Sequence, residues 1–138
     1  MSAATRPPGL CPSAPLPEIR TAKREATQRL LGATMGLSDE EWQAPSRLAG
    51  WTRAHIATHI ARNGEALETV TRAVVAGRDV PRLYPSDEVR DGDIERGSER
   101  TGVELQIDLD TTAGSLNATF DSLEGMEPGT AVWLTDDI

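Results

Sequence analysis

Cysteine, histidine and aromatic residues are scarce in this sequence of 138 residues. The single cysteine, Cys11, excludes a disulfide bond within the chain, and its place in the stretch RPPGLCPSAPLP favours an uninvolved tail thiol over a nucleophile. Aromatic residues make up 4% of the chain, too few for the platforms on which single-stranded nucleic acid stacks. The only histidines are His55 and His59, which limits the imidazole ligands that the sequence can offer to a metal ion.

Basic charge and long apolar runs are lacking as well. The chain has 14 Lys and Arg residues against 22 Asp and Glu residues, a net charge of −8. A negative field repels nucleic acids and anionic membrane surfaces. No run approaches the ~18 apolar residues of a membrane-spanning helix, and the start MSAATRPPGL lacks the apolar centre of a signal peptide. We therefore expect no nucleic-acid partner, no membrane, and a cytoplasmic location.

The chain length fits one helical domain flanked by two short tails. Residues 1–15 are rich in proline and are predicted to be disordered. Residues 16–125 carry helical apolar patterns and are predicted to form the domain. Residues 126–138 contain turn residues followed by the apolar patch AVWL, and we interpret them as a divergent tail.

Apolar residues at helical spacing predict the first two long helices. The first covers about residues 16–36, and a short turn follows in which Ser38 and Glu41 form a capping box. The second begins after Thr52, a typical N-cap residue, and is expected to end near Gly77. Its length suits a helix of a bundle.

The second long helix is the most clearly indicated element of the sequence. Trp51 precedes its N-cap and is expected to pack on Ile56 as a hydrophobic staple. One apolar line runs along this helix, and it consists of Ile56, Ile60, Leu67, Val70 and Val74.

The second half of the domain is predicted to be helical too. Residues 86–100 suggest a short polar helix interrupted by glycines, and a last helix is expected from its cap Thr101 to Gly125. Apolar residues also alternate over residues 103–109, as in a strand, but no second strand pattern is available as a partner. The predicted fold class is therefore all-α, an up-down helical bundle.

The two histidines lie four residues apart on the second long helix. His55 falls in the first turn after Thr52, His59 lies one turn further, and Asn63 extends the same polar stripe. Two imidazoles at this spacing can chelate one metal ion. The spacing alone leaves two interpretations open: half of a metal site, or a capping-turn histidine beside a half-buried, hydrogen-bonded one.

Two motifs in this part of the chain resemble those of a known family. They are GWTRAHIATHIARN and YPSDEVRDGDIERGS, both within residues 46–100. On these residues the chain resembles the N-terminal domain of the mycothiol-dependent maleylpyruvate isomerases, which belong to the DinB-like metal-binding four-helix bundles. Residues 16–45 and 101–125 match by helix pattern only. The resemblance implies a DinB-like bundle.

The resemblance also implies a divalent metal ion, usually zinc, and mycothiol as the thiol cosubstrate. In the family, one histidine of the second helix and an E-x-x-x-H pair of the fourth hold the metal, and water completes the shell. The family's ligand is the second histidine of the GWTR segment, which carries over to His59 and not to His55.

The reaction implied is an isomerisation of an organic acid. Mycothiol thiolate adds to the cis double bond of maleylpyruvate, the resulting single bond rotates, and elimination gives fumarylpyruvate. Arg90, in the YPSDEVRD segment, is the candidate for holding the substrate carboxylates, and the alternative is a solvated surface arginine.

The sequence departs from the family pattern after residue 101. It contains no E-x-x-x-H motif there, so we expect the fourth helix and its ligands to be missing and the domain to be truncated. A bundle that lacks a helix exposes an apolar groove, here part of the Ile56/Leu67 and Leu116/Phe120 faces. From this exposure we expect a homodimer or a protein partner. Two functions follow: a thiol-dependent isomerase of this family, or a catalytically inactive helical module that binds a partner or itself.

Overall fold

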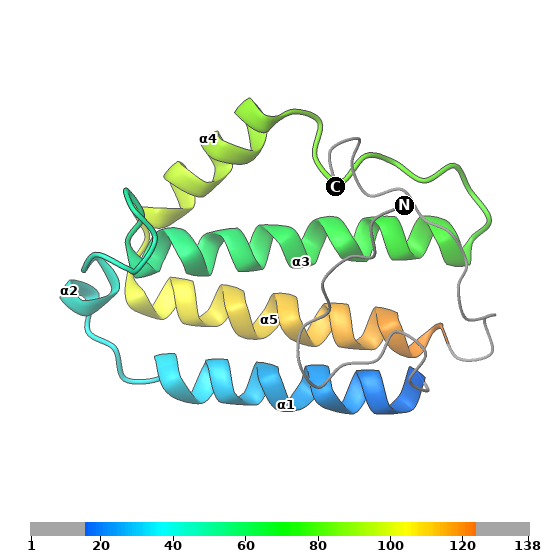
Figure 1. Cartoon of the computed structure of the whole chain (residues 1–138), viewed down its shortest axis with the longest axis horizontal. Helices are drawn as coiled ribbons and strands as arrows, with labels where there is room; N and C mark the ends of the chain where they lie inside the picture. Colours follow the sequence, from blue (N-terminus) through cyan, green and yellow to red (C-terminus); the bar gives the residue numbers. More distant parts are fainter. Residues whose placement is uncertain (1–15, 124–138) are drawn as a thin grey trace, which may run out of the picture.

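The computed structural model describes residues 16–123, which form helices and connecting turns without any strand. The helices are α1 (Leu16–Thr34), α2 (Asp39–Trp42), α3 (Arg53–Val75), α4 (Asp87–Ser98) and α5 (Gly102–Asp121) (Figure 1). The all-α expectation is therefore confirmed. The two predicted tails, residues 1–15 and 126–138, lie outside the described residues, as does Gly125.

Three long helices lie side by side, with α5 between α3 and α1 (Figure 1). Helix α1 runs opposite to the other two, whereas α3 and α5 run in the same direction because α4 and its connections carry the chain back. The end of α4 packs on the start of α3, and α4 diverges from α3 toward its own first residues. The core contains Trp42, Ala54, Ala57, Ala61, Leu105 and Leu109, with Leu30, Leu31 and Leu37 packed against it.

Helix starts follow the local sequence signals. Ser38 caps α2 and forms a capping box with Glu41, as the sequence predicts. The hydrogen bonds that Glu41 accepts at Ser38 lower the pKa of its carboxyl group, with Arg53 adding a smaller effect. Thr52 caps α3 and Thr101 caps α5, each by accepting a hydrogen bond from a backbone N–H of the first turn. Both predicted starts are confirmed.

Helix α3 buries small residues and leaves most of its apolar line partly buried or exposed. Its buried residues are mostly small, and Ile60 is 39% exposed. The reason is the close approach of α3 to α5: a Cβ atom added at Gly64 would lie 2.9 Å from the Thr112 methyl carbon. Of the predicted line, only Val70 is fully buried, at 3% exposure. Small side chains therefore decide which face turns inward, and the large ones lie beside it.

Helix α5 resolves the conflict between the helical and strand patterns. Leu105, Leu109 and Leu116 are buried at helical spacing, while Val103 and Ile107 are 69% and 59% exposed. The capping signal and the longer periodicity prevail because a lone strand has no partner for its backbone hydrogen bonds. The helix ends at Asp121, earlier than predicted, with Ser122 as its C-cap.

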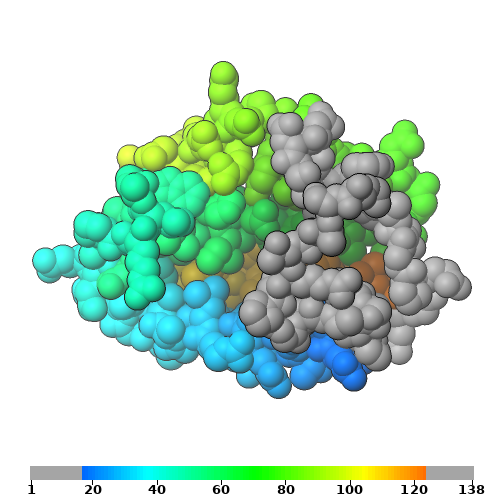
Figure 2. Space-filling model, in the orientation of Figure 1, coloured from blue at the N-terminus to red at the C-terminus, as the bar shows by residue number. Residues whose placement is uncertain are grey.

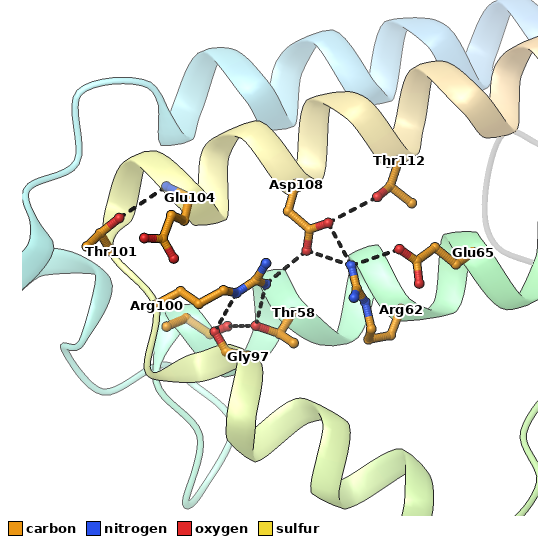
Figure 3. A network of polar contacts seen from close by, with 10 residues as sticks. Thr58, Arg62, Glu65, Gly97, Arg100, Thr101, Glu104, Asp108 and Thr112 are labelled. Carbon is orange, nitrogen blue, oxygen red and sulfur yellow. Dashed lines mark hydrogen bonds and ion pairs between the residues drawn. The ribbon is translucent and has the colours of Figure 1, made fainter.

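A partly buried carboxylate, Asp108, ties three parts of the fold together (Figure 3). It accepts hydrogen bonds from Arg62 on α3 at 2.6 and 2.8 Å, and from Arg100 in the turn before α5 at 2.9 Å. Arg100 also donates to the carbonyl oxygen of Gly97 at 2.9 Å and to the Thr58 hydroxyl at 3.4 Å. One carboxylate thereby links α3, α5 and the end of α4.

We expect Asp108→Asn to lower the free energy of unfolding by about 1.5–3 kcal/mol, because two arginines lose a charged acceptor in a partly buried place. Urea denaturation measures this change. Asp110→Asn, on the exposed side of the same helix, is the matched control and should change stability by less than about 0.5 kcal/mol. Equal effects of the two substitutions would contradict a structural role for Asp108.

Candidate functional site

The candidate site lies on the side of α3 that faces α4 and the segment before it. His55, His59 and Asn63 follow one another at four-residue spacing on α3. His55 reaches Glu95 on α4, and Asn63 reaches Tyr84 in the connection to α4. The polar stripe predicted from the sequence therefore has partners at both ends, and His59 lies between them.

His55 completes the N-terminal cap of α3. Its Nδ1 atom accepts the backbone N–H of Thr52 at 3.1 Å, so the ring hydrogen lies on Nε2, which donates to the Glu95 carboxylate at 3.1 Å. The Thr52 hydroxyl lies 2.8 Å from the same Nδ1 and accepts the backbone N–H of His55. Both ring nitrogens are thus used, which matches the capping-turn interpretation of His55.

Trp51 lies against both histidines. Its ring stacks on His55 with centroids 6.3 Å apart and an angle of 12° between the planes. The centroids of the Trp51 and His59 rings lie 5.4 Å apart, with an angle of 55° between the ring planes. The sequence predicts that Trp51 packs on Ile56, and the structure adds contacts of its ring with His55 and His59. Trp51 is therefore a wall of the candidate site.

His59 has a buried ring nitrogen and a lowered pKa. Its Nδ1 atom is buried and has no hydrogen-bond partner within residues 16–123. Burial lowers the pKa of His59, and the positive charge of Arg90 lowers it further, because both disfavour the protonated ring. An unprotonated ring nitrogen without a protein partner is the form in which histidine binds a metal ion.

Arg90, on α4, lies close enough to His59 for its charge to affect that ring. Its guanidinium carbon lies 6.0 Å from the centre of the Tyr84 ring, and its Nη1 donates to the Asp91 carboxylate at 2.9 Å. The Tyr84 hydroxyl in turn accepts a hydrogen bond from the Asn63 side chain at 3.2 Å. The two site residues singled out in the sequence, His59 and Arg90, are therefore electrostatic neighbours. Tyr84 was missed in the sequence, although it lies in the same YPSDEVRD segment as Arg90.

Close backbone contact holds α4 against the start of α3. A Cβ atom added at Gly97 would lie 2.2 Å from the Thr58 methyl carbon, so only glycine fits there without movement. Ile94 and Ser98 are the buried residues of this otherwise polar helix. The His55–Glu95 hydrogen bond adds a polar link at the same end. These contacts fix α4 close to the two histidines.

The described residues do not assemble a metal shell by themselves. Within residues 16–123 there is no group of three His, Cys, Asp or Glu side chains that could hold a metal ion. Glu65 pairs with Arg62 at 3.0 Å. The carboxylate of Glu68 accepts hydrogen bonds from Ser115 at 2.7 Å and Thr119 at 3.0 Å, on α5. Both glutamates therefore have other partners within the described residues.

Comparison with known proteins places the sequence in a family. The model of the mycothiol maleylpyruvate isomerase N-terminal domain matches residues 23–137. The chain belongs to this family. No curated protein matches the sequence.

Two solved structures have the same fold. One is a crystal structure of the mycothiol-dependent maleylpyruvate isomerase, with 28% sequence identity and a TM-score of 0.73. The other is a crystal structure of a histidine-to-alanine mutant of a mycothiol-dependent maleylpyruvate isomerase, with 27% identity and the same TM-score. Each alignment covers 78% of this chain but 44% of the solved chain. No helix among the described residues is long and apolar enough to cross a membrane.

The lowered pKa of His59 predicts how the metal-free protein responds to acid. In the unfolded chain an imidazole binds a proton near its ordinary pKa of 6.5, whereas folded His59 binds it only at lower pH. The contribution of His59 to the free energy of unfolding is therefore complete above pH 6.5. It is lost as the pH falls from 6.5 through the pKa of the folded state. Chemical denaturation at a series of pH values measures the loss, which should be smaller in His59→Gln.

Arg90→Gln serves as the control for the cause of this shift. Removal of the guanidinium charge should raise the pKa of His59 and so reduce the acid sensitivity without abolishing it, because burial is the larger cause. If wild type and His59→Gln lose stability in parallel between neutral and mildly acidic pH, His59 is not held neutral by the fold.

Proposed function

We propose that this chain contributes the His59 part of a metal site for the thiol-dependent cis-trans isomerisation of maleylpyruvate to fumarylpyruvate, with mycothiol as the thiol. The observation that carries the proposal is His59 itself. Its buried Nδ1 has no hydrogen-bond partner within the described residues, and burial and the positive charge of Arg90 lower the pKa of its ring. Membership of the mycothiol maleylpyruvate isomerase N-terminal domain family supports the choice of thiol and substrate.

A single histidine does not hold zinc. Catalytic zinc sites use three protein ligands and leave one position to water or substrate. Since residues 16–123 offer no cluster of three donors around His59, the proposal requires the other ligands to come from outside these residues or from a second chain. Zinc, when bound, would hold the thiol as a thiolate near neutral pH.

The residues around His59 fit a small organic acid with carboxylate groups. Among the described residues, Arg90 pairs only with Asp91, so most of its five N–H donors are available to a carboxylate. Its contact with the Tyr84 ring restricts the orientation of the guanidinium group. The Trp51 ring shields His59 from one side. In this proposal Arg90 holds the substrate acid while the bond that was double rotates.

A second candidate function is a helical module that binds a protein partner or a second copy. The observation that favours it is the exposure of large apolar side chains, among them Met35, Val103 and Ile107, which are 72%, 69% and 59% exposed. Exposed apolar patches drive association when they are contiguous. This function needs no metal ion.

Zinc titration of tag-free protein, with elemental mass spectrometry and oligomeric mass from the same sample, tests the first function. We expect near-stoichiometric zinc, and we expect His59→Ala to weaken zinc binding far more than His55→Ala, because both nitrogens of His55 are already used. Arg90→Gln is the matched control: it should bind zinc as wild type does and weaken binding of the dicarboxylate substrate.

Equal losses in the two histidine variants would contradict the assignment of the ligand to His59 and favour chelation by the pair. A protein that keeps its helical spectrum but binds no zinc would contradict the isomerase function and favour the partner-binding module.

A further inference from the structure

Arg90 lies in a part of α4 that has few packing contacts. Helix α4 begins after its cap Ser86, and its buried residues, Ile94 and Ser98, both belong to its second half. The helix diverges from α3 toward its first residues (Figure 1). In the space-filling view it forms part of the outer edge of the molecule (Figure 2). Apolar packing therefore fixes the end of α4, but not the turn that carries Arg90.

A hydrogen bond from α3 holds the connection that leads into this turn. The side-chain amide of Asn63 donates to the Tyr84 hydroxyl at 3.2 Å. The centre of the Tyr84 ring in turn lies 6.0 Å from the guanidinium carbon of Arg90. All three residues are partly buried, so water competes with these contacts less than it would at an exposed surface. Asn63 follows His59 by one turn of α3, so this series of contacts starts beside the proposed metal ligand.

The ion pair between Arg90 and Asp91 is a weaker constraint on the guanidinium group. Asp91 is the next residue along the chain, and its side chain is 66% exposed. Exposed ion pairs contribute little because water and salt screen them. The orientation of Arg90 therefore depends mainly on Tyr84. This matters for binding, because an arginine that is already ordered loses less side-chain entropy when a ligand arrives.

We propose that Asn63 and Tyr84 are positioning residues of the candidate site, which hold the guanidinium group of Arg90 ready for a carboxylate of the substrate. The inference rests on the proposed function, in which Arg90 binds that carboxylate. Asn63 acts through Tyr84, and Tyr84 acts through Arg90, so neither residue has to touch the substrate. The charge of Arg90 contributes to the lowered pKa of His59, which agrees with a guanidinium group held on the α3 side of α4.

NMR of the arginine side chains in the full chain tests the positioning without any ligand. The Nε–H signal of Arg90, identified by its loss in Arg90→Gln, reports how ordered the guanidinium group is. We expect an ordered signal in the wild type and a mobile one in Tyr84→Leu, which removes the ring. Asn63→Leu and Tyr84→Phe both remove the hydrogen bond and keep an aromatic ring, so they should increase the mobility by the same intermediate amount. The double variant should match either single variant, since all three lack the same hydrogen bond.

Asn117→Leu is the matched control for Asn63→Leu. It removes a hydrogen bond of the same kind, which Lys23 of α1 donates to α5, away from Arg90. The Arg90 signal should not change in this control. A signal that is already mobile in the wild type would overturn the proposal, and so would a signal that stays unchanged in both Asn63→Leu and Tyr84→Leu.

Titration with maleate, a cis dicarboxylate, separates this inference from the proposed function. We expect Tyr84→Leu to weaken maleate binding about fivefold or more, and the combination with Arg90→Gln to bind no more weakly than Arg90→Gln alone. Equal maleate affinities of the wild type and Tyr84→Leu would overturn the positioning role. If the wild type does not bind maleate but its Arg90 signal is ordered and depends on Tyr84, the proposed function fails while the positioning of Arg90 stands.

Discussion

The close approach of α3 to its neighbours is the constraint on which the rest of the structure depends. Ala57, Ala61 and Gly64 let α3 lie near α5, and Gly97 lets the end of α4 come within contact of Thr58. Such contacts are short because the side chains are small. They place the histidine stripe of α3 toward α4 and leave the larger residues of α3, including Ile60, beside the core instead of in it.

Polar contacts at the start of α3 determine which ring nitrogens of the two histidines are bonded and which are not. The cap of the helix uses a histidine where a glutamate is common, and the other nitrogen of that ring links to α4. One turn later, the Nδ1 atom of His59 has no hydrogen-bond partner within the described residues. The difference between His55 and His59 thus comes from the surroundings of each ring, although the two residues lie on the same helix only four positions apart.

The sequence predicts those features that depend on neighbours along the chain. Helix starts at Ser38, Thr52 and Thr101 follow from side chains that satisfy backbone groups a few residues away. The fully buried face of α3 does not follow from its apolar line, because small residues at the contact with α5 bring the two helices close together. The Asp108 network and the position of Trp51 over the histidines involve residues or orientations that only the tertiary fold brings together.

The contact between α3 and α5 is formed mainly by small and apolar side chains, among them Ala57, Ala61, Gly64, Leu105 and Leu109. Two carboxylates interrupt it: Asp108 of α5 bonded to Arg62, and Glu68 of α3 bonded to Ser115 and Thr119. A shift of one helix past the other by a single turn, about 5.4 Å, would separate both from their partners at once. These two carboxylates therefore fix the register of α5 along α3, because any other register would leave them without their partners.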